Sequence, residues 1–149
     1  MGRFLSNAIM KIDKKGRVSI PAPFRSVLQK AEETSVYTLL ALDRPVVNAG
    51  GEAWLQAQEA VLNQLDPMSD RYAEESFVLH GDGAFVKLDD TWRMVLPDSI
   101  REHAQIQDAI AFVGRGQFFQ MWEPERFHVY REEVRKRVQA RRIASQDDR

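Results

Sequence analysis

The chain has 149 residues, no cysteine and a formal net charge of −1 at pH 7, and its hydrophobic and charged fractions are 44% and 29%. This length suits one domain or two small units that share a core, and the composition is that of a globular chain rather than a disordered one. The lack of cysteine excludes disulfides, cysteine nucleophiles and cysteine-rich zinc sites, and it suits a reducing compartment.

No apolar run approaches the ~20 residues that a membrane-spanning helix needs, and the first residues lack the pattern of a secretory signal. We therefore expect a cytoplasmic protein that does not bind membranes. The sequence pI of about 6.3 does not by itself indicate a nucleic-acid partner. Any such function must depend on local clusters of charge.

The first basic segment, residues 11–25, reads KIDKKGRVSIPAPFR and holds five basic residues against one acidic residue. Short apolar runs predict strands over Ala8–Ile12 and Arg17–Ile20, separated by a tight turn. Pro21 cannot donate a hydrogen bond to a continuing ladder, so it ends the second strand and opens a short helical segment.

Two short apolar runs follow, split by a turn at residues 43–45, and their β-branched and aromatic content predicts two more strands. A helix is predicted next, because apolar residues recur there at roughly helical spacing. These residues are Trp54, Leu55, Val61, Leu62 and Leu65. Residues 66–83 are expected to form a link that contains one short helix between turns.

The same order of elements returns in the second half of the chain. Residues 87–101 read KLDDTWRMVLPDSIR, and strands are predicted over Phe85–Leu88 and Arg93–Leu96. Two apolar runs split by a turn at residues 114–116 follow, and a helix is expected from about Pro124.

An internal repeat relates the two segments, since about ten positions match in order and without a gap at a spacing of 76 residues. The matched pairs include Asp13 and Asp89, Arg17 and Arg93, Pro21 and Pro97, and Arg25 and Arg101. A single unit of ~70 residues would not bury a comfortable core. The duplication therefore predicts an α+β fold in which two copies pack against each other.

Lys14, Lys15 and Arg17 lie at the expected hairpin tip, where side chains are exposed. Lysine and arginine replace counterions on a phosphate backbone, an arginine fork can bind two acceptors of one guanine, and a two-stranded ribbon can enter a major groove. The alternative is a solvated tip whose lysines only aid solubility. Asp13 repels phosphate, so we expect it to accept backbone N–H groups of the turn and to hold Arg17 in place.

The segment IDKKGRVSIPAPFR resembles the DNA-binding motif of the swapped-hairpin transcription factors related to bacterial AbrB. Two tandem copies, each with Asp-x-x-x-Arg, resemble the MraZ family over residues 4–130. The resemblance implies two units that swap hairpins into an intramolecular pseudo-dimer. It also implies a ring-like homo-oligomer at the nucleoid that binds repeated promoter boxes on double-stranded DNA. Such a protein represses the division and cell-wall gene cluster, and no cofactor or metal is implied.

The resemblance and the charge argument together give the candidate residues. The turn-structuring residues are Asp13, Gly16 and Asp89, and the DNA-binding residues are Lys14, Lys15, Arg17 and Arg93. The corresponding domains are 4–65 for the first repeat, 66–83 for the link, 84–142 for the second repeat with its basic helix, and 143–149 for a frayed tail.

The second turn departs from the family pattern, because Trp92 takes the position of Gly16. A glycine suits a turn residue at positive φ, whereas a tryptophan is strained there. The second turn therefore has another geometry, or Trp92 has another use. Its segment also has no net charge, with three basic and three acidic residues over 87–101. We expect the first hairpin to supply most of the electrostatic affinity for DNA.

Other interpretations remain open at this point. The basic C-terminal helix is a solvated face, or it contacts DNA or a neighbouring subunit. An enzyme is disfavoured, because His80, His103 and His128 lie 23 and 25 residues apart and near no serine or carboxylate constellation in the sequence. The remaining alternative is a protein-interaction or assembly scaffold without specific DNA binding, for which a steep salt dependence of DNA binding is not expected.

Overall fold

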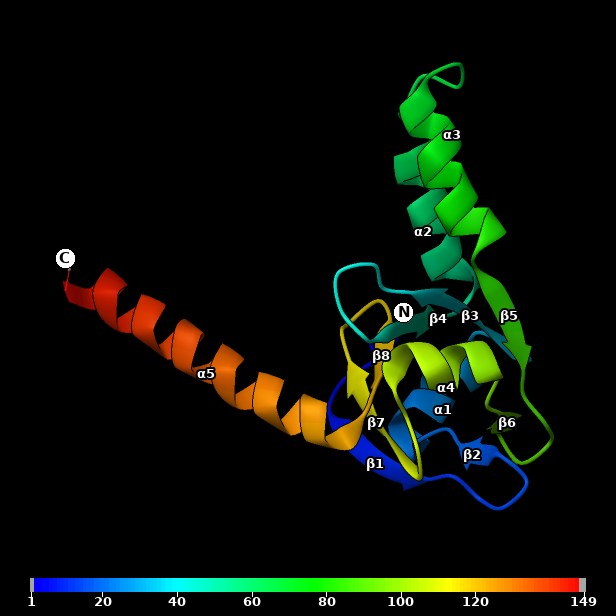
Figure 1. Cartoon of the computed structure of the whole chain (residues 1–149), viewed down its shortest axis with the longest axis horizontal. Coiled ribbons are helices and arrows are strands. Elements are labelled where there is room, and N and C mark those ends of the chain that lie inside the picture. The colour runs from blue at the N-terminus through cyan, green and yellow to red at the C-terminus, as the bar shows by residue number, and fades with distance from the viewer. Residues whose placement is uncertain (1, 148–149) are drawn as a thin grey trace.

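The computed structural model describes residues 2–147, and the fold is α+β, with an antiparallel sheet and flanking helices (Figure 1). The first half contains β1 (Asn7–Lys11), β2 (Arg17–Ser19), α1 (Ala22–Lys30), β3 (Ser35–Leu40), β4 (Val47–Gly50) and α2 (Glu52–Leu62). A link holds α3 (Asp70–Ser76) and the π-helical turn η1 (Phe77–Gly81). The second half contains β5 (Ala84–Lys87), β6 (Arg93–Val95), α4 (Asp98–Ala104), β7 (Ala109–Gly114), β8 (Phe119–Trp122) and α5 (Pro124–Asp147).

Local sequence explains most of these elements. The four predicted strands beside the two turns are confirmed, each within one residue of its expected bounds. Pro21 and Pro97 stand directly before α1 and α4, where a missing N–H costs nothing because the first N–H groups of a helix have no intrahelical partner. Two details of the helix predicted at the end of the first repeat are wrong. Val61 does not join the buried face of α2, because it is 63% exposed, and Leu65 lies beyond the end of α2 at Leu62.

Strands of the two halves are interleaved in space. The six-stranded sheet has the order β1-β7-β8-β4-β3-β5, so β1 pairs with a strand of the second half and β5 with a strand of the first. β2 and β6 form a separate two-stranded sheet. The two strands that flank each turn therefore belong to different sheets, and the turn is where the chain crosses from one sheet to the other.

The pairing pattern follows the sequence repeat. Arg17 lies opposite Val95 and Ser19 opposite Arg93, and these two pairs exchange when each residue is moved by the 76-residue spacing. At the centre of the large sheet, Asn48 lies opposite Gln120, and the Gln120 Nε2 donates to Asn48 Oδ1 at 2.8 Å. The central residue pair is thus Val18 with Met94 in the small sheet and Asn48 with Gln120 in the large one, and the two halves of the chain lie on opposite sides of each pair.

One hydrophobic core joins the two halves. Positions that match in the repeat are buried in pairs: Val18 with Met94, Ile20 with Leu96, Phe24 with Ile100, and Leu28 with Ala104. Burial of each large side chain contributes about 1.5–3 kcal/mol. Because each half buries its side chains against the other, either half alone would lose much of this stabilisation. The core fixes β2 and β6 from beneath, and it leaves the turns beside them at the surface.

Two helical segments project from this body in different directions (Figure 1). One consists of α2 with α3 and η1, which run back along it, and the other is α5. α5 continues past residue 143, where the sequence predicts a frayed tail, and is helical to Asp147. Residues 148–149 of that tail lie outside the described residues.

Candidate nucleic-acid interface

Asp13 organises the turn between β1 and β2. Its Oδ1 accepts hydrogen bonds from the backbone N–H groups of Lys15 at 2.9 Å and Arg17 at 2.8 Å, and its Oδ2 accepts one from Arg17 Nε at 2.7 Å. The Gly16 N–H donates to the Asp13 carbonyl oxygen at 3.0 Å and closes the turn. A single carboxylate thus fixes both the backbone of the turn and the direction of the arginine.

These contacts favour the ionised carboxylate. The hydrogen bond from the Arg17 backbone N–H is the largest cause that holds the pKa of Asp13 below its ordinary value of 3.8. The Arg17 side chain is 30% exposed, and only its Nε is engaged by Asp13. Among residues 2–147 its two terminal nitrogens have no hydrogen-bond partner, so the fork is free to donate to a ligand.

The second turn repeats the same hydrogen bonds. The Asp89 Oδ1 accepts from the backbone N–H groups of Thr91 at 2.9 Å and Arg93 at 3.0 Å, and Oδ2 accepts from Arg93 Nε at 3.1 Å. The Thr91 hydroxyl adds a bond to Asp89 Oδ1 at 2.9 Å. Led by the Arg93 backbone N–H, these bonds lower the pKa of Asp89 to about 2. No role for Thr91 was predicted from the sequence, although threonine hydroxyls commonly hydrogen-bond within turns.

Trp92 adopts the conformation that the first turn gives to glycine. Gly16 has φ of 80° and Trp92 has φ of 61°, and the Trp92 N–H closes its turn on the Asp89 carbonyl at 3.0 Å. The expectation that the second turn has another geometry is therefore wrong. The second possibility holds instead, because the half-buried indole packs against the main core, and this contact offsets the cost of the left-handed backbone.

The β2–β6 ribbon brings the two turns together. The Ile20 N–H donates to the Trp92 carbonyl, and the Leu96 N–H donates to the Gly16 carbonyl, both at 2.9 Å. Each turn is thus held by the strand of the other half. Because these bonds come in a matched pair, the two turns are fixed relative to each other as well as to the core.

Alternation along the ribbon separates a buried face from an outer face. Val18 and Met94 are buried, so Arg17 and Arg93 share the opposite face with Ser19 and Val95. Arg17 and Arg93 occupy diagonal positions, for which ordinary sheet geometry places the two residues roughly 7–8 Å apart, and their Cβ atoms somewhat closer. The ribbon therefore presents two arginines, each fixed at its Nε, on one exposed surface.

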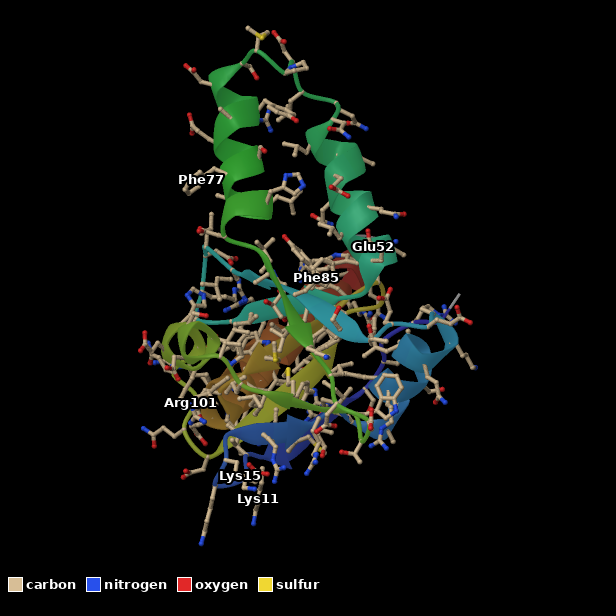
Figure 2. All side chains as sticks on the ribbon, turned by 90° about the vertical axis from the view of Figure 1, so that its right-hand side faces the viewer. Lys11, Lys15, Glu52, Phe77, Phe85 and Arg101 are labelled. Atoms are coloured by element: carbon tan, nitrogen blue, oxygen red, sulfur yellow. The ribbon has the colours of Figure 1, made fainter. Side chains whose placement is uncertain are left out.

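The candidate lysines lie only at the first turn. Lys14 and Lys15 are exposed, and the Lys15 and Lys11 side chains extend away from the body (Figure 2). The corresponding tip of the second turn has Asp90 and Thr91 in place of the two lysines. The shared geometry is thus combined with opposite charge at the two tips.

The environment of His80 includes one contact that the sequence does not predict. His80 Nε2 lies 3.0 Å from Glu59 Oε2, and His80 Nδ1 lies 3.5 Å from Ser76 Oγ. Glu59 is 21 residues from His80, and no local pattern signals their proximity. Within residues 2–147 no group of three or more acidic, histidine or cysteine side chains is arranged to hold a metal ion.

Comparison with known proteins relates the whole chain to one family. The model of the MraZ protein family matches residues 80–147. The chain is 40% identical to the Transcriptional regulator MraZ of Xanthobacter autotrophicus over 97% of this chain and 92% of that protein. It is 39% identical to the protein of the same name from Rhizobium meliloti over 98% of this chain and 100% of that protein. In the part of the chain that the structure describes, no helix is both long and apolar enough to span a bilayer. On these similarities, the chain belongs to the MraZ family.

Proposed function

We propose that this protein is a sequence-specific DNA-binding regulator of transcription, and that Arg17 and Arg93 read base edges while Lys14 and Lys15 bind phosphates. The observation that supports this most directly is the β2–β6 ribbon, whose outer face carries two arginines whose side chains, among residues 2–147, form hydrogen bonds only through Nε. A two-stranded ribbon fits a B-DNA major groove, and an arginine fork matches guanine O6 and N7. The names of the relatives, which are transcriptional regulators, agree with this role.

The proposal includes the internal architecture. The two repeats are residues 4–65 and 84–142, joined by the link at 66–83. The first strand of each repeat pairs with a strand of the other repeat, and the two repeats so form a pseudo-dimer within one chain. The pairing of β1 with β7 and of β5 with β3 supports this arrangement. Asp13, Gly16 and Asp89 shape the turns that present the cationic side chains.

The proposed biological role is repression of the bacterial division and cell-wall gene cluster in the cytoplasm, at the nucleoid. Several chains assemble into a ring-like homo-oligomer and engage repeated promoter boxes together. Each chain offers a small contact surface, and linked sites raise avidity on the order of 10²–10⁴ where geometry allows simultaneous binding. No cofactor is required for this activity.

Selection of bound fragments from random duplex DNA tests the proposal. We expect enrichment of a short box that recurs within the selected fragments, and binding to that box should weaken steeply as salt is raised. Arg17→Ala combined with Arg93→Ala, in a folded protein, should abolish the enrichment. A wild-type protein that enriches no sequence and shows no steep salt slope would instead be the interaction scaffold.

A further inference from the structure

α5, the basic arm, is a long helix with almost no partner in its own chain. Its 24 residues span about 36 Å, and Phe127 is its only buried residue. The N-terminal end of α5 is held against the body by the stacking of Trp122 on Tyr130, with ring centroids 4.9 Å apart. From Glu132 to Asp147 every residue is exposed except the half-buried Val134 and Val138. Helices in proteins take most of their stability from tertiary packing, so this helix lacks its usual support.

The corresponding helix of the first half does have a partner. α2 follows β4 as α5 follows β8, and α3 with η1 runs back along α2 (Figure 2). Leu55 and Leu62 of α2 cluster with Leu79 of η1, and Glu59 contacts His80. α2, α3 and η1 together form the acidic arm, residues 52–82. The repeat therefore supplies a covering helix in one half and none in the other.

The two arms carry opposite charge. The acidic arm has seven acidic residues and one basic residue, whereas residues 126–142 of the basic arm have seven basic residues and two acidic ones. Both acids of that basic stretch, Glu132 and Glu133, pair with arginines of their own helix. Among the described residues, Arg141 and Arg142 have no carboxylate partner, and neither Glu74 nor Glu75 has a cationic one.

Each arm also exposes apolar surface beside its charges. Phe77 is 69% exposed and follows Asp70 and Glu74 at helical spacing, so an aromatic ring lies on an acidic face. Val134 and Val138 line a shallow groove of the basic arm with Arg135 and Arg142. An exposed aromatic residue bordered by acids fits an apolar groove bordered by arginines.

From these observations we infer that the basic arm of one copy docks on the acidic arm of a second copy, with Phe77 against the Val134–Val138 groove. The arms project from the body in different directions, so they do not meet within one chain (Figure 1). A contact between two different surfaces is heterologous, and its repetition closes a ring or extends a filament. The inference rests on the proposed homo-oligomer and names the surfaces that build it.

Complementary variants test this docking. Glu74→Lys with Glu75→Lys alters only the acidic arm, and Arg141→Glu with Arg142→Glu alters only the basic arm. Oligomer mass is measured by sedimentation and native mass spectrometry without DNA, and circular dichroism checks that each variant is folded. We expect each variant to weaken assembly at least tenfold, while Lys30→Glu, at an exposed position of α1, leaves the mass of the wild type unchanged.

A mixture of the two variants gives the sharpest result. Each variant keeps one intact surface, and the two altered surfaces are again opposite in charge. An equimolar mixture should therefore regain the large assembly with the two variants alternating, and a chain carrying all four changes should regain it alone. A basic-arm variant that keeps its mass but loses DNA binding would overturn the docking and make α5 a DNA contact. A monomeric wild type would overturn the assembly itself, and DNA binding measured in parallel reports separately on the proposed function.

Discussion

The turns Asp13–Arg17 and Asp89–Arg93 have the same hydrogen bonds but different charges. In both, an aspartate carboxylate accepts hydrogen bonds from two backbone N–H groups and from an arginine Nε, and the residue before the arginine has positive φ. Lys14 and Lys15 face solvent in the first turn, where Asp90 and Thr91 face it in the second. The comparison shows that a few bonded residues fix the shape of the turn whatever the charge of the exposed residues between them. Under the proposed function, those exposed residues set the affinity of each turn for phosphate.

The core contact of Trp92 gives the largest expected change in stability. Truncation of a fully buried tryptophan to alanine costs about 3–5 kcal/mol, so a half-buried one should cost about 2 kcal/mol. Urea unfolding of Trp92→Ala measures the loss. Trp92→Gly is the matched control, since glycine relieves the left-handed backbone and should recover about 1 kcal/mol relative to alanine. Equal stabilities for the two variants would contradict the strain assigned to this position.

Charge at the first tip is tested by Lys14→Ala with Lys15→Ala. Loss of two phosphate contacts should flatten the slope of log K against log salt by roughly 1.8, which corresponds to about a tenfold change between 50 and 200 mM salt. Fluorescence anisotropy with a selected DNA fragment at several salt concentrations gives the slope. Lys30→Ala, an exposed lysine on α1, should leave it unchanged. An unaltered slope in the double variant would place the phosphate contacts elsewhere.

Gly16→Ala removes the glycine that the first turn uses where the second has tryptophan. A Cβ at this position meets nothing within 4 Å, so the cost comes from φ of 80° alone and should be about 1 kcal/mol. Gly16→Asn should cost less, because asparagine tolerates the left-handed region. Thermal unfolding of both variants measures the difference. A more stable Gly16→Ala variant would show that the turn does not keep this conformation in solution.

Acid sensitivity gives the smallest effect. Because the pKa of Asp89 is about 2 when folded and near its ordinary 3.8 when unfolded, its contribution is fully present above pH 3.8 and is lost as the pH falls toward 2. Asp89→Asn should be less stable than the wild type at pH 7, and the difference should shrink below pH 3.8. Urea unfolding at pH 7, 4 and 3 measures it. A difference that grows on acidification would have the wrong sign.

Some of this architecture follows from local sequence and some does not. The bounds of the strands beside the turns were predictable, because short apolar runs favour strands and a following proline ends them, and both signals depend on only a few neighbouring residues. The advantage of glycine at positive φ is also a local signal. At Trp92, however, packing of the indole against the core outweighs the cost of placing a residue other than glycine there. The exposure of Val61 and the contact of Glu59 with His80 depend on which helix covers α2, and residue spacing along α2 alone does not reveal this.

The proposed difference between the two turns in DNA binding is tested most directly by comparing Arg17→Ala with Arg93→Ala. Both arginines are fixed by an aspartate on the same ribbon face, so the two substitutions remove equivalent groups. After folding and assembly are verified, affinity for a selected promoter fragment is measured at one salt concentration. We expect Arg17→Ala to lose about 1–3 kcal/mol of binding free energy and Arg93→Ala to lose less, because Asp90 repels phosphate where Lys14 and Lys15 attract it. An equal or larger loss for Arg93→Ala would contradict the account.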